Sequence, residues 1–278
     1  MSSLLEVGMN TEIVHNENLS FKHSILAVFL VFTFGANAVA VKLTFLGLGT
    51  FSAAGIRFAL ASIVITTWAL ITKQPLKLKP GQFKQLFVFS LVFTVQLSLI
   101  YFGLSKTEAS RATLISNLQP FFLLVLAHFF VPGDKFTIRK IIGLLMGLFG
   151  LIIVFADSKV KGSVLYTGDV LVLIGTFIWA SSIVYLKRII AHFRPFQIVL
   201  YQMFISSPLF LLEGYLFDTQ MVFKLDWIII GSLLYQSVIT ASFGFITWSN
   251  LLQRYGAVAL HSYLFIMPIA GVFCSWLI

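Results

Sequence analysis

The chain has 278 residues, of which 59% are hydrophobic and only 10% charged, and its mean hydropathy is +0.97. A soluble domain carries about 25% charged residues, so this composition excludes a soluble protein and predicts one that crosses a membrane many times. The net charge of +9 does not indicate a nucleic-acid partner, because Lys and Arg lie mostly in short loops, where they encode membrane topology.

In chain order, nine apolar segments predict membrane-crossing helices. A helix needs roughly 20 apolar residues to cross hydrocarbon about 30 Å thick, and each segment comes near that length. The predicted helices are 25–45, 51–72, 85–104, 109–131, 139–156, 168–190, 197–217, 227–251 and 256–277. Short polar turns separate them, which leaves almost no chain for a soluble domain. The pattern predicts an all-α integral membrane protein with nine transmembrane helices.

The polar N-terminus and the single cysteine limit the remaining possibilities. Residues 1–24 begin with a polar stretch that lacks the basic start and apolar core of a cleavable signal peptide, so we expect a cytoplasmic tail. Cys274 is the only cysteine, which excludes an internal disulfide and a cysteine-based metal cluster. We predict no metal site and no cofactor.

The distribution of basic residues predicts the orientation in the membrane. If the N-terminus is cytoplasmic, the cytoplasmic loops hold about twice as many Lys and Arg residues as the outer loops. Cytoplasmic loops carry the excess of positive charge in membrane proteins. We therefore expect a multi-pass protein of the bacterial inner membrane with its N-terminus in the cytoplasm.

Two pairs of segments indicate an internal duplication. Residues 31–43, VFTFGANAVAVKL, align with residues 175–188, GTFIWASSIVYLKR. Farther along, ASRATLISNLQP aligns with AVALHSYLFIMP, and Pro120 then meets Pro268. One unit holds five helices, an odd number, so its copy must enter the membrane from the opposite side. Inverted repeats of this kind build many secondary transporters.

The duplication divides the chain into two predicted repeats. The first is 25–156, with helices one to five, and the second is 157–278, with helices six to nine. The fifth helix of the first repeat has no counterpart before Ile278. We expect either a tenth helix that this chain has lost or a nine-helix variant.

Several motifs resemble those of a known transporter family. They are FGANAVAVKL, TFSAAGIRFALAS, the run ASRATLISNLQPFFLLVLAHFFVPGDKFTIRKIIGLLMGLFG, and FIWASSIVYLKR, in the family's order. The chain resembles the EamA-type ten-helix members of the drug/metabolite transporter superfamily from about residue 25 to 278, apparently without the last helix. It departs from the pattern at Phe34, where the family often has Trp. The resemblance implies a carrier with a central cavity lined by both repeats, working by alternating access.

Arg57 is the charged residue placed deepest in a predicted helix. It lies about six residues into the second helix, roughly 9 Å from its outer end. One interpretation is an arginine that reaches the outer lipid headgroups. The other is a cation that faces the cavity and binds a carboxylate or phosphate through its planar guanidinium.

Uncharged polar and aromatic residues within helices are the other candidates for substrate binding. An amide at membrane depth needs a partner in the protein or a water-filled cavity, although hydrogen bonds between helices explain it equally well. Aromatic rings could stack on a substrate or form apolar walls, and His261 could carry a proton. With Arg57, the predicted substrate-binding residues are Asn37, Gln96, Asn117, Gln119, Trp179, Tyr185, Gln202, Gln236 and His261.

Two lysines and three glycines complete the predictions. Lys42 and Lys187 lie near helix ends at equivalent positions of the repeats, where they either reach the headgroups or gate and steer an anion. Gly143, Gly147 and Gly150 are spaced for close approach of another helix. The acidic residues cluster at helix ends or outer loops, which argues for an exchanger or facilitator, or for proton coupling through His261.

These features favour an inner-membrane secondary transporter, an exporter or exchanger of a small polar metabolite such as an amino acid or organic anion. The alternative is a truncated, non-transporting protein or an assembly partner. A membrane enzyme fits less well, because the helices hold no HExxH, GxSxG or paired carboxylates. The predicted partners are a small-molecule substrate and the lipid bilayer, with a homodimer compatible and no nucleic acid.

Overall fold

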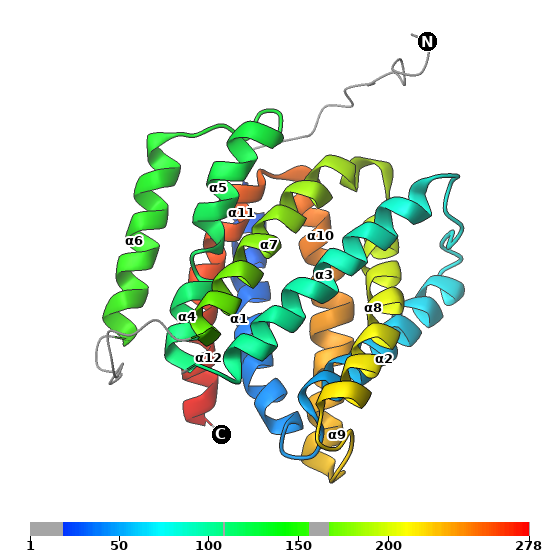
Figure 1. Ribbon diagram of the computed structural model, residues 1–278. Helices are drawn as coiled ribbons and strands as arrows, with labels where there is room; N and C mark the ends of the chain where they lie inside the picture. Colours follow the sequence, from blue (N-terminus) through cyan, green and yellow to red (C-terminus); the bar gives the residue numbers. More distant parts are fainter. Residues whose placement is uncertain (1–18, 108, 156–166, 278) are drawn as a thin grey trace, which may run out of the picture.

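The computed structural model describes residues 19–107, 109–155 and 167–277, and their regular elements are helical (Figure 1). The longer uninterrupted helices are α1 Phe21–Thr44, α2 Thr50–Ile71, α3 Gln82–Leu104, α6 Ile138–Phe155, α7 Thr167–Ile189 and α8 Pro195–Phe217. The interrupted ones consist of α4 Ala109–Ser116, α5 Gln119–Phe130, α9 Trp227–Leu234, η2 Tyr235–Gly244, α10 Phe245–Arg254, α11 Ala257–His261, η3 Ser262–Phe265 and α12 Ile266–Leu277, and the short turn η1 Ile190–His192 follows α7.

Eight of the helical segments in the described ranges are long and apolar enough to cross a membrane. With α6, 18 residues long, they correspond one to one with the nine predicted segments. The prediction of an all-α membrane protein is therefore confirmed. Helix α1 begins at Phe21, four residues before its predicted start. The predicted boundary between the repeats, near residue 157, lies outside the described residues.

Two helices are interrupted at corresponding places in the two halves. The predicted fourth helix breaks after Ser116 and resumes at Gln119, with Pro120 in the first turn of α5. The predicted ninth helix passes through the 3₁₀ turn η3 before α12, which has Pro268 in its first turn. Proline fits the first turn of a helix because its missing N–H would have no intrahelical acceptor there. Each proline therefore lies in the first turn of the helix that resumes after the break.

The predicted eighth helix contains a segment that the apolar pattern did not reveal. Residues Tyr235–Gly244 form a π-helix between α9 and α10. The Ser242 hydroxyl donates to the Ser237 carbonyl, five residues back, at 2.7 Å. Wide π turns in α-helices occur frequently at functional sites. This segment changes which side chains the helix presents to α1 and α2.

The helices pack in reciprocal pairs across the two halves. Helix α2 packs extensively on α8, and α3 packs on α7 while η2 and α9 pack on α1. Helix α1 packs on α12, and α5 and α4 pack on α7. Each contact thus has a counterpart in which the halves exchange roles, which is the arrangement that an inverted repeat predicts. The largest buried apolar cluster joins α1, α5, α7 and α11.

Helix α6 lies at one side of the bundle, beside α5 (Figure 1). A Cβ atom at Gly147 would come within 2.7 Å of the Phe265 ring in η3, so glycine permits this close approach. Cβ atoms at Gly143 and Gly150 would meet nothing within 4 Å. The prediction of three packing glycines therefore describes only Gly147 here, because α6 has few neighbours in the described part of the chain.

Candidate functional site

Unpaired polar atoms in the membrane-crossing helices mark the candidate site. A buried polar atom without a hydrogen-bond partner costs about 1–3 kcal/mol, so such atoms are rare unless water or a ligand serves them. In the described part of the chain, the buried side-chain atoms without a protein partner are Asn37 Oδ1, Arg57 Nε, Gln96 Oε1, Gln119 Nε2, Thr240 Oγ1 and His261 Nε2. All but Thr240 belong to residues that the sequence predicted for substrate binding.

Arg57 points into the protein and contacts side chains of two other helices. Its Nη2 donates to the Tyr101 hydroxyl of α3 at 3.0 Å, and its Nη1 donates to Gln236 Oε1 of η2 at 3.4 Å. The guanidinium carbon lies 4.5 Å from the centre of the Phe58 ring. Among the described residues, no carboxylate lies within the 4.0 Å of an ion pair with Arg57. Within the described ranges, the arginine is therefore a cation without a carboxylate counterion.

Gln236 holds Arg57 from the first turn of the π-helix. Its Nε2 donates to the Ala40 carbonyl at 3.2 Å and lies 3.4 Å from Thr44 Oγ1, both on α1. Its side-chain oxygen is therefore turned toward Arg57, and the glutamine is 1% exposed. These hydrogen bonds join α1, η2, α2 and α3 around the Arg57 guanidinium. Tyr101 was not among the predicted site residues, since only tertiary contact shows its role.

His261 and Gln119 meet where both interrupted helices break. His261 Nδ1 lies 3.3 Å from Gln119 Oε1, and each residue is 1% exposed. An amide oxygen only accepts hydrogen bonds, so Nδ1 carries the proton in this pair. His261 Nε2 and Gln119 Nε2 remain, an acceptor and a donor without protein partners. The Trp248 ring packs edge-on against His261 with centroids 5.6 Å apart.

The remaining predicted residues differ in their surroundings. Asn37 is half-buried and Gln96 is 5% exposed, and each keeps an unpaired oxygen. Asn117 donates to the Thr113 carbonyl of its own helix at 2.8 Å, so its amide is used locally. Gln202 is buried. Trp179 and Tyr185 pack against the main apolar cluster, and the Tyr185 hydroxyl donates to the Gln85 carbonyl at 3.3 Å.

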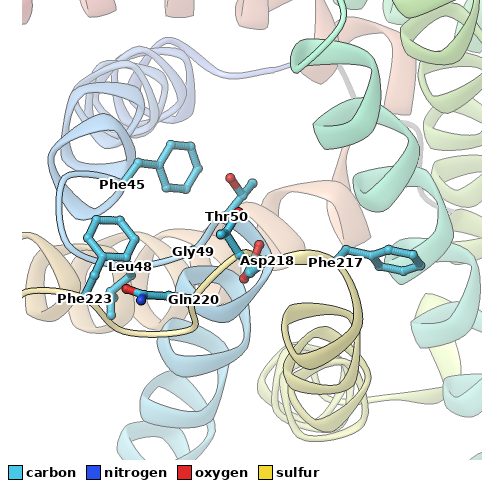
Figure 2. Close-up of a pocket in the computed structure, with 9 residues that line it drawn as sticks. Phe45, Leu48, Gly49, Thr50, Phe217, Asp218, Gln220 and Phe223 are labelled. Carbon is cyan, nitrogen blue, oxygen red and sulfur yellow. The ribbon is translucent and has the colours of Figure 1, made fainter.

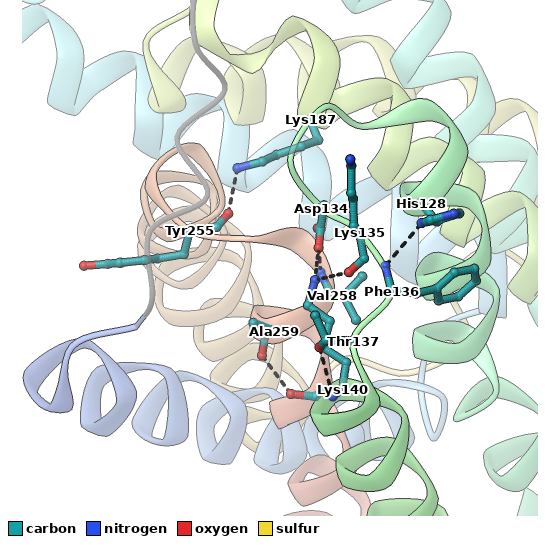
Figure 3. Close-up of polar contacts among 11 residues, drawn as sticks. His128, Asp134, Lys135, Phe136, Thr137, Lys140, Lys187, Tyr255, Val258 and Ala259 are labelled. Atoms are coloured by element: carbon teal, nitrogen blue, oxygen red, sulfur yellow. Dashed lines mark hydrogen bonds and ion pairs between the residues drawn. The ribbon is translucent and has the colours of Figure 1, made fainter.

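The two lysines at equivalent positions of the repeats have opposite environments. Lys42 is exposed near the end of α1. Lys187 is fully buried, and its Nζ donates to the Leu252 carbonyl at 2.6 Å. It also donates to the Tyr255 carbonyl at 2.6 Å (Figure 3). An ammonium enclosed by the protein does not reach the headgroups, so that interpretation does not describe Lys187.

Asp134, in the turn between α5 and α6, is a buried carboxylate near Lys187. It is 1% exposed, accepts from Lys140 Nζ at 2.5 Å, and lies 3.3 Å from the Val258 backbone nitrogen (Figure 3). Its charge also attracts the Lys187 ammonium. These contacts tie the turn between α5 and α6 to α7 and α11 at one end of the bundle.

A pocket of about 480 Å³ opens at the other end of the bundle, between the loop after α1 and the loop after α8 (Figure 2). Asp218 lies in it beside Gly49 and Thr50. Its carboxylate accepts from the Ser52 nitrogen at 2.9 Å and the Ser52 hydroxyl at 2.7 Å, so it caps the N-terminus of α2. A Cβ atom at Gly49 would lie 2.3 Å from Asp218, so the close approach requires glycine.

Comparison with known proteins identifies the family. The profile of the EamA-like transporter family matches residues 22–156 and again residues 166–278. The chain is 26% identical to a "Probable amino-acid metabolite efflux pump" of Escherichia coli strain K12, over 91% of the chain and 86% of that protein. It is 21% identical to the "Uncharacterized transporter YoaV" of Bacillus subtilis strain 168, with the same coverage.

A solved crystal structure has the same fold. It superposes with a TM-score of 0.79 at 17% identity and covers 91% of this chain and 87% of its own. The two family matches span nearly all of the described helices. The chain belongs to the EamA-like transporter family.

Proposed function

We propose that the chain is a secondary transporter of the inner membrane that exports or exchanges a small amino acid or organic anion. In this proposal Arg57 binds the substrate carboxylate, and the substrate crosses by alternating access between the two repeats. The observation that carries the proposal is Arg57 itself, a half-buried guanidinium with an unpaired Nε and no protein counterion among the described residues. A cation in a membrane helix usually pairs or marks a substrate path.

The other unpaired polar atoms of the membrane-crossing helices support a substrate with several hydrogen-bonding groups. Asn37 Oδ1, Gln96 Oε1 and Thr240 Oγ1 can accept from an ammonium or hydroxyl group. Gln119 Nε2 can donate, and neutral His261 Nε2 can accept. A zwitterionic amino acid or a hydroxylated organic acid carries both kinds of partner. The printed name of the Escherichia coli relative, an amino-acid metabolite efflux pump, favours the same substrate class.

The loops on the same side of the membrane as the N-terminus hold the excess of Lys and Arg, which supports a cytoplasmic N-terminus. The end of the bundle that holds Lys187 and Asp134 would then face the cytoplasm, and the Asp218 end would face outward. Alternating access requires the helices to part at one end while they stay packed at the other. Such a motion must either keep or break the hydrogen bonds of Lys187 at one end and of Asp218 at the other.

Countertransport in proteoliposomes tests the proposal. Vesicles containing the full chain are loaded with an unlabelled amino acid or organic acid, and exchange of the labelled compound is measured for a panel of both classes. Hydrogen bonds to a charged group contribute about 1.5–3 kcal/mol, so Arg57→Gln should slow exchange at low substrate concentration at least about tenfold. Arg57→Lys should restore part of the rate, because it keeps the charge but not the planar fork.

Lys84→Gln is the matched control, since it removes an exposed cation of α3, the helix that carries Tyr101. It should leave exchange unchanged. Equal exchange by wild type and Arg57→Gln would overturn the role of Arg57. If wild type moves no compound of either class, the transport proposal fails for this chain.

A further inference from the structure

Glu213 is an acidic side chain within a membrane-crossing helix that the proposed transport site does not use. It lies four residues before the end of α8 and is half-buried. Its neighbours Leu212, Tyr215 and Leu216 are 55%, 76% and 60% exposed, so this face of α8 meets lipid when the helix spans a membrane. An ionised carboxylate in such a place is costly unless it is paired or protonated.

The hydrogen atoms around Glu213 do not suffice for an ionised carboxylate. The Ser98 Oγ atom of α3 lies 2.8 Å from Glu213 Oε1 and 2.7 Å from Oε2. The same Oγ lies 2.8 Å from the Thr94 carbonyl. A serine hydroxyl has one hydrogen to donate, and here three acceptor oxygens surround it. With Glu213 ionised, at least one close oxygen pair would have no hydrogen between the atoms.

A proton on Glu213 adds a second hydrogen to this arrangement. The carboxyl group then donates to Ser98 Oγ, and the Ser98 hydroxyl donates to the Thr94 carbonyl. Two of the three short contacts of Ser98 Oγ then have a hydrogen, against one hydrogen for all three when Glu213 is ionised, and no charge remains at the lipid-facing surface. The proton comes from water and joins one carboxylate oxygen, so the step needs no other reactant.

No basic group in the described structure compensates Glu213. Three helices pack against α8, and each has one basic residue. Arg57 of α2 bonds to Tyr101 and Gln236 and forms no ion pair with Glu213, while Lys84 of α3 and Arg254 of α10 lie at the opposite end of the bundle. On the chain after α8, Asp218 caps α2.

We propose that Glu213 is a proton-binding site, protonated while α3 and α8 pack as they do here and ionised when the Ser98 contact opens. The same turn of α3 carries Tyr101, which holds Arg57, so movement of this turn acts on the proton and on the proposed substrate cation together. Proton binding follows from Glu213 and Ser98 alone. The link to substrate rests on the proposed function and makes the proton the exchanged ion.

Infrared spectroscopy of the full chain in lipid tests proton binding without any substrate. Wild type should show the carbonyl band of a protonated carboxyl at neutral pH, and this band should disappear as pH rises. Glu213→Gln should lack the band, and Ser98→Ala should shift its frequency because the acceptor of the carboxyl proton is gone. The control Asp226→Asn removes an exposed carboxylate paired with Lys224 and should leave the band in place. A wild type without the band at neutral pH, or a band that persists in Glu213→Gln, overturns the site.

A pH gradient across proteoliposomes tests the link to transport. Wild type should move substrate faster when the gradient is imposed, and Glu213→Gln should keep exchange in the absence of a gradient but lose the acceleration. Full acceleration in Glu213→Gln overturns the link. If wild type moves no substrate, the proposed function fails, while the infrared band still decides whether Glu213 binds a proton.

Discussion

Lys187 and Arg57 are two cations inside the same bundle, and they differ in how completely protein groups form hydrogen bonds with them. Lys187 is fully buried and donates to two carbonyls at 2.6 Å, with the Asp134 carboxylate nearby. Arg57 is only half-buried, its two hydrogen bonds measure 3.0 and 3.4 Å, and its Nε has no partner. Burial of a charge therefore does not by itself identify a ligand site. The incomplete pairing of Arg57 is the reason why we propose it as the substrate-binding cation.

The difference follows from where each cation meets its neighbours. Leu252 and Tyr255 lie at the end of α10, where carbonyl groups lack intrahelical partners and carry the negative end of the helix dipole. Lys187 satisfies those carbonyls, so its charge stabilises the fold. Arg57 lies within α2 and meets only side chains, which can move to admit a carboxylate. Four substitutions or conditions would break or sharpen this contrast.

The largest expected effect is that of Lys187→Met. Two buried carbonyls would lose their donor at about 1–3 kcal/mol each, so we expect a loss of about 3 kcal/mol in the free energy of unfolding. Lys42→Met is the matched control at the equivalent position and should change almost nothing, because Lys42 is exposed. Thermal unfolding of both variants in the same lipid or detergent measures the difference. Equal melting temperatures with altered exchange rates would instead indicate the gating role for Lys187.

Gln236→Leu should come next. It removes the side chain that contacts Arg57 and that donates to the Ala40 carbonyl of α1. Because Gln236 acts through Arg57, the KM for exchange should rise about tenfold, or ~1.4 kcal/mol, with little change in maximal rate. Countertransport at varied substrate concentration separates the two quantities. A variant that lowers only the maximal rate would place Gln236 outside the Arg57 site.

Tyr101→Phe should have a smaller effect of the same kind. It deletes one hydroxyl that accepts from Arg57 and keeps the ring that packs against Phe51. One hydrogen bond contributes about 1 kcal/mol, so KM should rise roughly fivefold. Tyr201→Phe removes a hydroxyl of a half-buried tyrosine that bonds to the Leu76 carbonyl instead, and it serves as the control. If both variants raise KM equally, the change reflects general packing.

The smallest expected effect is that of changing Asp226. This carboxylate is partly exposed, whereas Lys187 is fully buried and Arg57 is half-buried. The Lys224 side chain, and then the Ile229 backbone nitrogen at 2.9 Å, lower the pKa of this carboxyl below its ordinary 3.8. Its stabilisation of α9 is therefore present above about pH 4 and is lost as pH falls through the lowered pKa. Asp226→Asn should remove this acid-dependent part of the melting temperature and no more. An unchanged pH profile would show that the cap contributes nothing measurable.

Hydropathy predicted most of the membrane-crossing helices, and the features that it did not predict have physical causes. Predicted and observed helix ends agree within a few residues because leaving backbone polar groups unpaired in lipid is costly. The sequence did not predict the π-helix at Tyr235–Gly244, because its side chains keep the apolar composition of an ordinary helix. Gly143 and Gly150 have the spacing of packing glycines, yet contact also requires a neighbouring helix, and only Gly147 has one.

The sequence by itself determined that the chain crosses a membrane many times, that its halves are related, and which polar residues lie at depth, because insertion into lipid penalises every polar group in proportion to its exposure there. Only the tertiary structure decided how those residues are used. It paired Lys187 with two carbonyls, left Arg57 without a counterion among the residues that it describes, and brought Glu213 to Ser98. Hydrogen bonds depend on distances of a few ångströms between helices far apart in the chain, which no local pattern specifies.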